Sequence, residues 1–273
     1  MTAPWVLVGG GYTGGRVARA LVHRGEAVTV TRRTAEAAQA LAAELGVRGV
    51  PADLSDAATL DGLVPAGAIV VVLAPPGPEP ADEMRRLLDA AGGARRVVYV
   101  SSTGVYGAGG GAWVDETWPL APLSASGRAR VAAEHALSAS PVSHVALRVA
   151  GIYGPGRGLA DRLRAGTYRV VGDGRAHVSR IHVDDLVTAI LAAGTSSVTG
   201  AINVADDDPA PIGEVADALA GKLGLPPPPR VPASEVGAEV AAMLTADRRI
   251  ANRRMKSELG VTLRYPSWRD APV

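Results

Sequence analysis

Three glycines near the start of the chain have the spacing of a phosphate-binding loop. Gly9, Gly11 and Gly14 form the pattern G-x-G-x-x-G, and Tyr12 and Thr13 lie between the last two. An apolar run precedes this loop, and apolar residues with helical spacing follow it. A tight turn of bare backbone lets the N–H groups at the start of a helix bind a pyrophosphate. The pattern therefore predicts that these five residues bind a dinucleotide.

The end of the second expected strand indicates which dinucleotide is bound. NAD enzymes usually have an acidic residue there, which hydrogen-bonds the adenine ribose. This chain has Arg32 and Arg33, and a guanidinium binds a 2′-phosphate through paired charge-assisted hydrogen bonds. We therefore expect NADP in preference to NAD, the alternative being two solvated arginines that open a helix. Asp53 and Leu54 follow the third expected strand, where such folds contact the adenine, and a helix cap is the alternative role for Asp53.

Short apolar strands alternate with helical segments through the first half of the chain. The pattern predicts an α/β fold, a Rossmann-type doubly wound parallel sheet with helices on both faces. The expected strands are residues 5–9, 27–31, 47–50, 68–74, 96–101 and 144–153. The expected helices are residues 14–25, 34–45, 56–63, 81–92 and 125–139. Ala74, Pro75 and Ser101, at the ends of two of these strands, are further candidates for contact with the cofactor.

The alternation becomes looser in the second half. The expected elements are an extended pair over 168–183 with a turn at Gly172–Gly174, helices over 184–193, 212–223 and 235–257, and a strand over 201–206. Asp184 is the expected N-cap of the first of these helices. We expect a dinucleotide-binding domain over residues 1–155. A smaller C-terminal substrate lobe over 156–273, partly interleaved with the sheet, then encloses a ligand between the two.

Composition and charge exclude several classes of protein. The 273 residues are 47% hydrophobic and 20% charged, which predicts a packed core. A net charge of +1 gives no electrostatic footprint for nucleic acid or an anionic membrane. The chain has no cysteine, and its five histidines lack metal-ligand spacing, so we expect no metal. The apolar run 68–76 is too short to span a bilayer, and a first strand near Trp5 leaves no room for a signal peptide. We therefore expect a cytoplasmic protein.

Six segments follow one another in a recognisable order. They are GGGYTG (9–14), VVYVSSTGVYG (97–107), VDETWP (114–119), LRVAGIYGPGRG (147–158), RIHVDDLV (180–187) and INVADD (202–207). Together they resemble the extended short-chain dehydrogenase/reductases, in the NAD-dependent epimerase/dehydratase group. The resemblance implies hydride transfer at a carbonyl or hydroxyl carbon of a small or nucleotide-linked substrate.

The resemblance also implies a catalytic set of a Ser or Thr, a Tyr and a Lys. Ser102 stands at the serine position with Thr103 beside it, and its hydroxyl either bonds the substrate oxygen or caps backbone. The Tyr-x-x-x-Lys positions hold Ser126 and Arg130 instead, as in atypical subgroups. An aliphatic hydroxyl is a much poorer acid than a phenol, so Ser126 is a weak proton donor. Arg130 keeps a positive charge that either holds the ribose or is solvated on the helix.

Three other side chains are candidates to supply the missing proton. Tyr106 and Tyr153 follow strands at the ligand end of the expected sheet, and each either transfers a proton or packs the cleft wall. His182 either titrates near neutral pH or is a hydrogen-bonded structural histidine.

Further polar residues are candidates to contact the substrate. Arg157 and Arg180 either pair with an anionic substrate group or lie on the surface, and His177 lies near Arg180 in the sequence. In some atypical subgroups of the family that the sequence resembles, an Asp replaces the Asn that is usual in the active site. Asp82 is either that residue or a helix cap.

Two functions follow from these residues. The first is an NADP-dependent oxidoreductase or epimerase of a small-molecule substrate, with an atypical catalytic set. The second is a catalytically weak or inactive NADP-binding protein, such as a redox sensor or interaction module. Family members often form homodimers through two helices, and 81–92 and 125–139 are the candidates in this chain.

Overall fold

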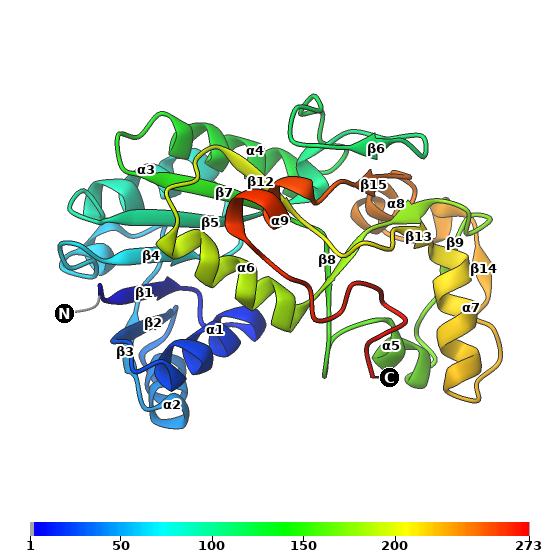
Figure 1. The fold of residues 1–273 in the computed structure, drawn as a ribbon, viewed down its shortest axis with the longest axis horizontal. Coiled ribbons are helices and arrows are strands. Elements are labelled where there is room, and N and C mark those ends of the chain that lie inside the picture. The colour runs from blue at the N-terminus through cyan, green and yellow to red at the C-terminus, as the bar shows by residue number, and fades with distance from the viewer. Residues whose placement is uncertain (1–2, 273) are drawn as a thin grey trace.

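Seven parallel strands form one sheet at the centre of the molecule. The computed structural model describes residues 3–272, and the strand order is β12-β7-β5-β4-β1-β2-β3 (Figure 1). The strands are β1 (Trp5–Val8), β2 (Val28–Arg32), β3 (Arg48–Pro51), β4 (Ile69–Val72), β5 (Arg96–Ser102), β7 (His144–Val149) and β12 (Ala201–Val204). This order is that of a Rossmann-type doubly wound sheet, as the sequence predicted.

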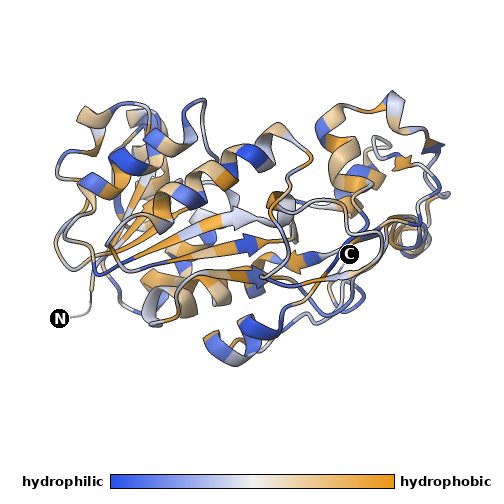
Figure 2. Cartoon of the chain, turned by 90° about the horizontal axis from the view of Figure 1, so that it is seen from above, coloured by the Kyte–Doolittle hydropathy of each residue, from blue (hydrophilic) through white to orange (hydrophobic). Residues whose placement is uncertain are grey.

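Helices cover both faces of this sheet. Strand side chains alternate between the faces, so Leu7 and Val71 pack with one apolar cluster while Val6 and Val70 pack with another. The first face carries α1 (Tyr12–His23), α2 (Ala35–Leu45), α6 (Val183–Thr195) and α9 (Arg253–Leu259). The second face carries α3 (Pro80–Ala90) and α4 (Ala125–Ser138). Figure 2 shows the strands as mostly hydrophobic, with hydrophilic residues toward the ends that face the smaller lobe.

The smaller lobe lies beyond the carboxyl ends of the strands (Figure 1). Its helices are α5 (Leu159–Arg164), α7 (Ile212–Lys222) and α8 (Ala238–Leu244), with a 3-10 turn η3 (Ala233–Glu235). Its short strands, with those at its border, are β6 (Trp113–Val114), β8 (Gly151–Tyr153), β9 (Val170–Val171), β10 (His177–Val178), β11 (Arg180–His182), β13 (Ala210–Pro211), β14 (Arg230–Val231) and β15 (Arg249–Ile250). The segment 156–273 thus supplies this lobe and also α6, β12 and α9 of the sheet layers.

Four expected elements differ in the structure. The expected strand 144–153 is divided into β7, which pairs with β5 in the main sheet, and β8, which pairs with β11. The segment 168–183 forms no extended pair with itself, because β9, β10 and β11 pair with β14, β13 and β8. Each is only two or three residues long, so distant chain segments decide its partner. The expected helix 235–257 is divided into α8 and α9, with β15 and a positive φ of 47° at Asp247 between them. The expected helix 56–63 is a 3-10 turn, η1 (Ala57–Leu60).

The cap of α6 also differs from the expectation. His182 is the N-cap, and its Nδ1 accepts a hydrogen bond from the Asp184 N–H at 3.2 Å. The helix therefore starts one residue before Asp184, which lies in its first turn.

No helix among residues 3–272 combines the length and apolar character needed to cross a membrane.

Candidate functional site

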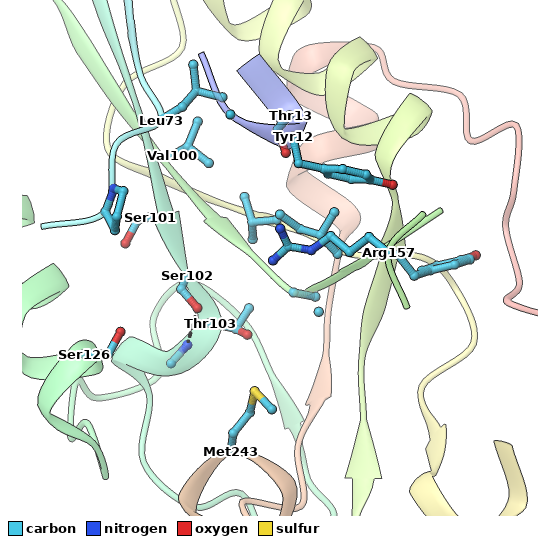
Figure 3. Close-up of a pocket in the computed structure, with 18 of the residues that line it drawn as sticks. Tyr12, Thr13, Leu73, Val100, Ser101, Ser102, Thr103, Ser126, Arg157 and Met243 are labelled. Carbon is cyan, nitrogen blue, oxygen red and sulfur yellow. Dashed lines mark hydrogen bonds between the residues drawn. The ribbon is translucent and has the colours of Figure 1, made fainter. Parts of the chain in front are cut away.

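A cleft of about 1700 Å³ opens at the carboxyl ends of the central strands, between the sheet and the smaller lobe. This cleft is lined by all the residues that the sequence suggested for cofactor, catalysis or substrate, except His182 and Asp82. Figure 3 shows Tyr12 and Thr13 on one side and Ser102, Thr103 and Ser126 on the other. The fold therefore brings segments from both halves of the chain to one site.

The glycine loop uses its three glycines in different ways. Gly9 has a φ of +111°, and a Cβ there would lie 2.6 Å from the Ala74 nitrogen. A Cβ at Gly14 would lie 2.2 Å from the Gly9 oxygen, so α1 packs closely on the loop. A Cβ at Gly11 would meet no described atom within 4 Å, and no side chain of residues 3–272 caps α1 there. The loop thus offers free N–H groups and open space, which fits a pyrophosphate.

Tyr12 and Arg157 connect this loop with the residues after β8. The Tyr12 hydroxyl donates to the Pro155 carbonyl at 3.1 Å, and the Arg157 Cζ lies 5.3 Å from the Tyr12 ring centroid. The Arg157 side chain is exposed and extends across the cleft between Tyr12 and Thr103 (Figure 3). It forms no ion pair with a described residue, so its charge is available to an anion.

The end of β2 presents two arginines to the same cleft. Arg32 donates from Nη1 to the Gly10 carbonyl at 3.0 Å, which holds its guanidinium beside the glycine loop. Arg33 is exposed next to it. Asp53 accepts from the Ser55 N–H at 2.9 Å, and this bond lowers the Asp53 pKa. Asp53 therefore closes its own turn, while Asp56 is the residue that caps η1.

Ser102 is the last residue of β5, and its register places it at the site. β5 pairs with β7 from Val97↔His144 to Ser102↔Val149. The Ser102 Oγ accepts from the Gly104 N–H at 3.0 Å, which leaves the hydroxyl proton free to donate. The neighbouring Ser101 is buried instead, and its hydroxyl donates to Glu134 at 2.5 Å. Because the Ser101 hydroxyl is hydrogen-bonded to Glu134, only the Ser101 backbone is available to a ligand in the cleft.

Ser126 and Arg130 lie one helical turn apart on α4. Ser126 is exposed in the first turn of the helix. Arg130 is half-buried and donates from Nη1 to the Val100 carbonyl at 3.1 Å. This bond fixes the guanidinium against β5, so Arg130 is not the freely solvated helix residue of the alternative.

The structure corrects the proton-donor role considered for Tyr106. Its side chain is fully buried, donates to Asn203 Oδ1 at 2.8 Å and accepts from Arg148 Nη1 at 3.0 Å. Burial raises the pKa of the Tyr106 hydroxyl. A phenol with both partners taken from the core cannot serve a substrate in the cleft, so Tyr106 packs the wall.

Tyr153 and His182 lie together on the paired strands β8 and β11. Their rings meet edge-on with centroids 5.2 Å apart. His182 is 2% exposed, and burial lowers its pKa, so it is a neutral structural histidine. The Tyr153 hydroxyl is buried without a hydrogen-bond partner in residues 3–272, and burial raises its pKa. Tyr153 can donate a hydrogen bond there, but it is a weak acid.

Two further candidates have other roles in the structure. His177 lines the cleft, yet its Nδ1 lies 2.8 Å from Asp247 Oδ1 and its Nε2 lies 3.0 Å from Arg249 Nη2. Its ring nitrogens are therefore occupied, which argues against a contact with substrate. Asp82 is exposed on α3 and pairs with Arg85, so it is a surface residue outside the site. No group of three or more His, Cys, Asp or Glu side chains with metal-binding geometry occurs between residues 3 and 272.

Comparison with known proteins agrees with this geometry. The sequence profile of the NAD(P)H-binding family matches residues 9–194, which is more than half of the chain. The chain belongs to the NAD(P)H-binding family. This membership confirms the dinucleotide-binding fold that the glycine loop predicted.

Individual relatives refine the comparison. The 3-diazoavenalumate denitrifying reductase of a Streptomyces species is 36% identical over 196 residues, 66% of this chain and 64% of that protein. The matched region therefore spans less than two thirds of this curated relative. A conserved protein of unknown function from Silicibacter pomeroyi DSS is 33% identical with a TM-score of 0.85, over 99% of this chain and 96% of that one.

A human relative extends the fold comparison to the expected group. The epimerase family protein SDR39U1, isoform 2, solved with NADPH, has a TM-score of 0.79 at 20% identity, over 98% of this chain and 97% of that one. At this identity the likeness concerns the fold alone. The fold is that of the epimerase/dehydratase group, as the sequence motifs indicated.

Within this NAD(P)H-binding fold, one part of the cleft wall was not foreseen from the sequence. Leu123, Val240 and Met243 are exposed apolar residues that line the cleft, and Met243 faces Thr103 and Ser126 (Figure 3). Glu239 accepts from the Ala125 N–H at 2.6 Å, which joins α8 to the start of α4. The sequence held no local signal for this contact, because 114 residues separate its two ends. The wall of the cleft beside Thr103 and Ser126 is therefore partly apolar.

Proposed function

We propose that this protein is an NADP-dependent oxidoreductase or epimerase that acts at a carbonyl or hydroxyl carbon. The observation that carries the proposal is the free hydroxyl proton of Ser102, which faces the cleft that the glycine loop and Arg32 also line. The reductase named among the relatives supports an oxidoreductase. Membership of the NAD(P)H-binding family supports binding of a nicotinamide dinucleotide. The preference for NADP over NAD rests on Arg32 and Arg33.

The residues present fit the cofactor. Gly11 and the uncapped start of α1 would hold the pyrophosphate, Arg32 and Arg33 the 2′-phosphate, and Arg130 the nicotinamide-side ribose. When bound in its reduced form, the cofactor supplies a hydride. Ser102 donates a hydrogen bond to the substrate oxygen and stabilises the negative charge that develops there. Because Ser126 replaces the usual phenol and Tyr106 is unavailable, water in the cleft brings the proton to this oxygen.

The test is NADPH oxidation over a panel of carbonyl compounds. Ser102→Ala removes one donor to the developing charge, so we expect kcat to fall by about 10²–10³-fold. Ser138→Ala is the matched control, because Ser138 is exposed at the end of α4 and outside the cleft. Equal rates for wild type and Ser102→Ala would remove Ser102 from the mechanism.

A non-catalytic NADP-binding protein is the second candidate function. It is favoured by Ser126 and Arg130, which replace the tyrosine and lysine of the resemblance. The double variant Ser126→Tyr with Arg130→Lys restores that pair. If wild type binds NADPH tightly but neither protein turns over any carbonyl compound, the non-catalytic function replaces the first proposal.

A further inference from the structure

Several buried polar atoms around the smaller-lobe side of the cleft have no hydrogen-bond partner among residues 3–272. They are Tyr153 Oη, Tyr168 Oη, Arg180 Nη2, Asp206 Oδ2 and Trp268 Nε1. Four of the five side chains line the cleft, Asp206 being the exception. Buried polar groups are nearly always paired, so a concentration of unpaired ones marks a place that a polar ligand or water completes.

The pairing of β8 with β11 places Arg180 and Tyr153 on one face. Gly151 pairs with Arg180, and Tyr153 pairs with His182. Side chains two residues apart on a strand point to the same side, and directly paired residues share a side. Gly151 has no side chain, and a Cβ there would lie 4.0 Å from the Arg180 Cγ. Burial raises the pKa of the Tyr153 hydroxyl, and Arg180 lies near enough for its charge to lower it.

Tyr168 and Trp268 complete the surroundings from other segments. Trp268 belongs to the small apolar cluster against which Tyr153 packs. Tyr168 lies close enough to Arg180 for the guanidinium charge to lower the Tyr168 pKa, which burial raises. Both rings are 4% exposed, so their polar atoms are not solvated like surface groups.

The charge of this cluster is positive. Arg180 is 8% exposed, donates from Nη1 to the Val178 carbonyl at 2.8 Å and has no carboxylate within ion-pair distance in the described chain. Asp206 is the acidic residue whose charge acts most on Arg180, and burial raises the pKa of the Asp206 carboxyl to about 8. Asp206 forms no ion pair with Arg180, so the guanidinium has no direct counter-ion among the described residues. A buried cation without a counter-ion is unfavourable, so an anion is the expected occupant.

We propose that Arg180, Tyr153, Tyr168 and Trp268 form a carboxylate-binding subsite, and that the substrate is an apolar carbonyl compound with one carboxylate group. The guanidinium and the indole N–H only donate, and the two phenols can donate, which suits the lone pairs of a carboxylate. One buried guanidinium without an ion pair matches the single negative charge of a carboxylate. The exposed Val240 and Met243 offer the apolar contact for the rest of the molecule.

This proposal names the substrate class of the proposed oxidoreductase and so rests on it, but its test requires no turnover. Isothermal titration calorimetry in the presence of oxidised NADP compares benzoate, cinnamate and 3-phenylpropionate with their carboxamides. The carboxamides keep the shape and lose the charge. We expect at least one acid to bind wild type about ten- to hundredfold more tightly than its carboxamide, as for a hydrogen bond to a charged group.

Single substitutions test whether the preference for acid over carboxamide comes from Arg180 and its neighbours. Arg180→Met should abolish the preference for the acid, and Tyr168→Phe should reduce it severalfold. Arg175→Met is the matched control in the same lobe, because the Arg175 side chain is 89% exposed, and it should keep the preference. Circular dichroism verifies that each variant is folded. If Arg180→Met does not fold, the acid-to-carboxamide ratio in wild type and in Tyr168→Phe decides the matter.

Three outcomes would overturn the subsite: equal affinity of acid and carboxamide in wild type, no binding of any acid up to its solubility limit, or an unchanged preference in folded Arg180→Met. If NADPH oxidation still depends on Ser102 in that case, the oxidoreductase stands and only its substrate class is wrong. If the acids bind but no NADPH oxidation occurs, the subsite stands and the oxidoreductase fails.

Discussion

Among single residues, the arginines proposed to bind the cofactor and the serine proposed to act in the reaction lie at different places in the cleft. Arg32 and Arg33 lie at the end of β2 and just after it, three strands away in the sheet from Ser102 at the end of β5. Substitutions at the two places should therefore have different effects, one on binding of the cofactor and one on turnover. The residues at each place carry their own measurable predictions.

The choice of cofactor is tested at the arginines. The double variant Arg32→Asp with Arg33→Ala removes two cations and adds a carboxylate that repels a 2′-phosphate. We expect the Kd for NADPH to rise by about ten- to hundredfold and the Kd for NADH to change much less. Fluorescence titration with both cofactors measures this. Arg24→Asp, at an exposed arginine after α1, controls for net charge. An equal loss for NADPH and NADH would count against the assignment of NADP.

The buried carboxyl of Asp206 predicts a pH dependence of stability. Burial raises its pKa from 3.8 to about 8, so between these values the unfolded chain releases a proton that the folded chain keeps. Stability therefore falls as pH rises through this range. In Asp206→Asn that loss is absent, so its Tm relative to wild type should increase from pH 3.8 to about pH 8. Asp89→Asn, at an exposed residue of α3, is the control, and a Tm difference independent of pH would contradict the prediction.

At the scale of elements, a buried polar network joins the strands and the helix beneath Ser102. Glu134 on α4 pairs with Arg148 on β7 at 2.8 Å, and their side chains are 7% and 8% exposed. Ser101 on β5 and Tyr106 bond to this pair, and Tyr106 continues to Asn203 on β12. The network holds three strands and α4 in a fixed arrangement. It thereby fixes the end of β5, where the Ser102 hydroxyl faces the cleft.

Breaking this pair should be costly. Glu134→Ala leaves the Arg148 guanidinium buried without its carboxylate, so we expect the free energy of unfolding to fall by about 3–5 kcal/mol. Urea denaturation followed by circular dichroism measures the change. Glu44→Ala is the control, because Glu44 pairs with Arg19 on the surface and such pairs contribute about 0–1 kcal/mol. A similar small loss in both variants would show that the network does not stabilise the sheet.

At the scale of the whole molecule, the smaller lobe closes over one end of the sheet through α8. The Glu239 carboxylate accepts from the backbone N–H of Ala125, where α4 begins. A carboxylate at a helix N-terminus is favourable because it meets free N–H groups and the positive end of the helix dipole. The contact places Met243 opposite Thr103 and Ser126 (Figure 3). The apolar wall formed by Leu123, Val240 and Met243 therefore depends on how the smaller lobe packs against the sheet.

Loss of the Glu239 contact should loosen this wall. Glu239→Ala removes a cap of roughly 1 kcal/mol, so we expect amides of residues 238–244 to exchange about fivefold faster with deuterium. Hydrogen exchange with mass spectrometry measures this segment directly. Glu235→Ala, at an exposed glutamate of η3, is the nearby control. Unchanged exchange in Glu239→Ala would mean that other contacts hold α8 in place.

Local sequence patterns were enough to predict the Rossmann fold, the dinucleotide-binding loop and the place of Ser102 at the end of a strand. These features are local, because a glycine loop between strand and helix, or a serine at the end of a strand, is encoded within a few residues. The short strands after residue 168 and the break between α8 and α9 were not readable, since their partners come from distant segments. The hydrogen bonds of the buried Tyr106 hydroxyl became visible only in the folded chain, because its partners lie 42 and 97 residues away in the sequence. The tertiary structure also decided that the hydroxyls of Tyr153 and Tyr168 are unpaired beside Arg180. Burial and hydrogen bonding of such side chains depend on contacts between remote parts of the chain, which local patterns do not encode.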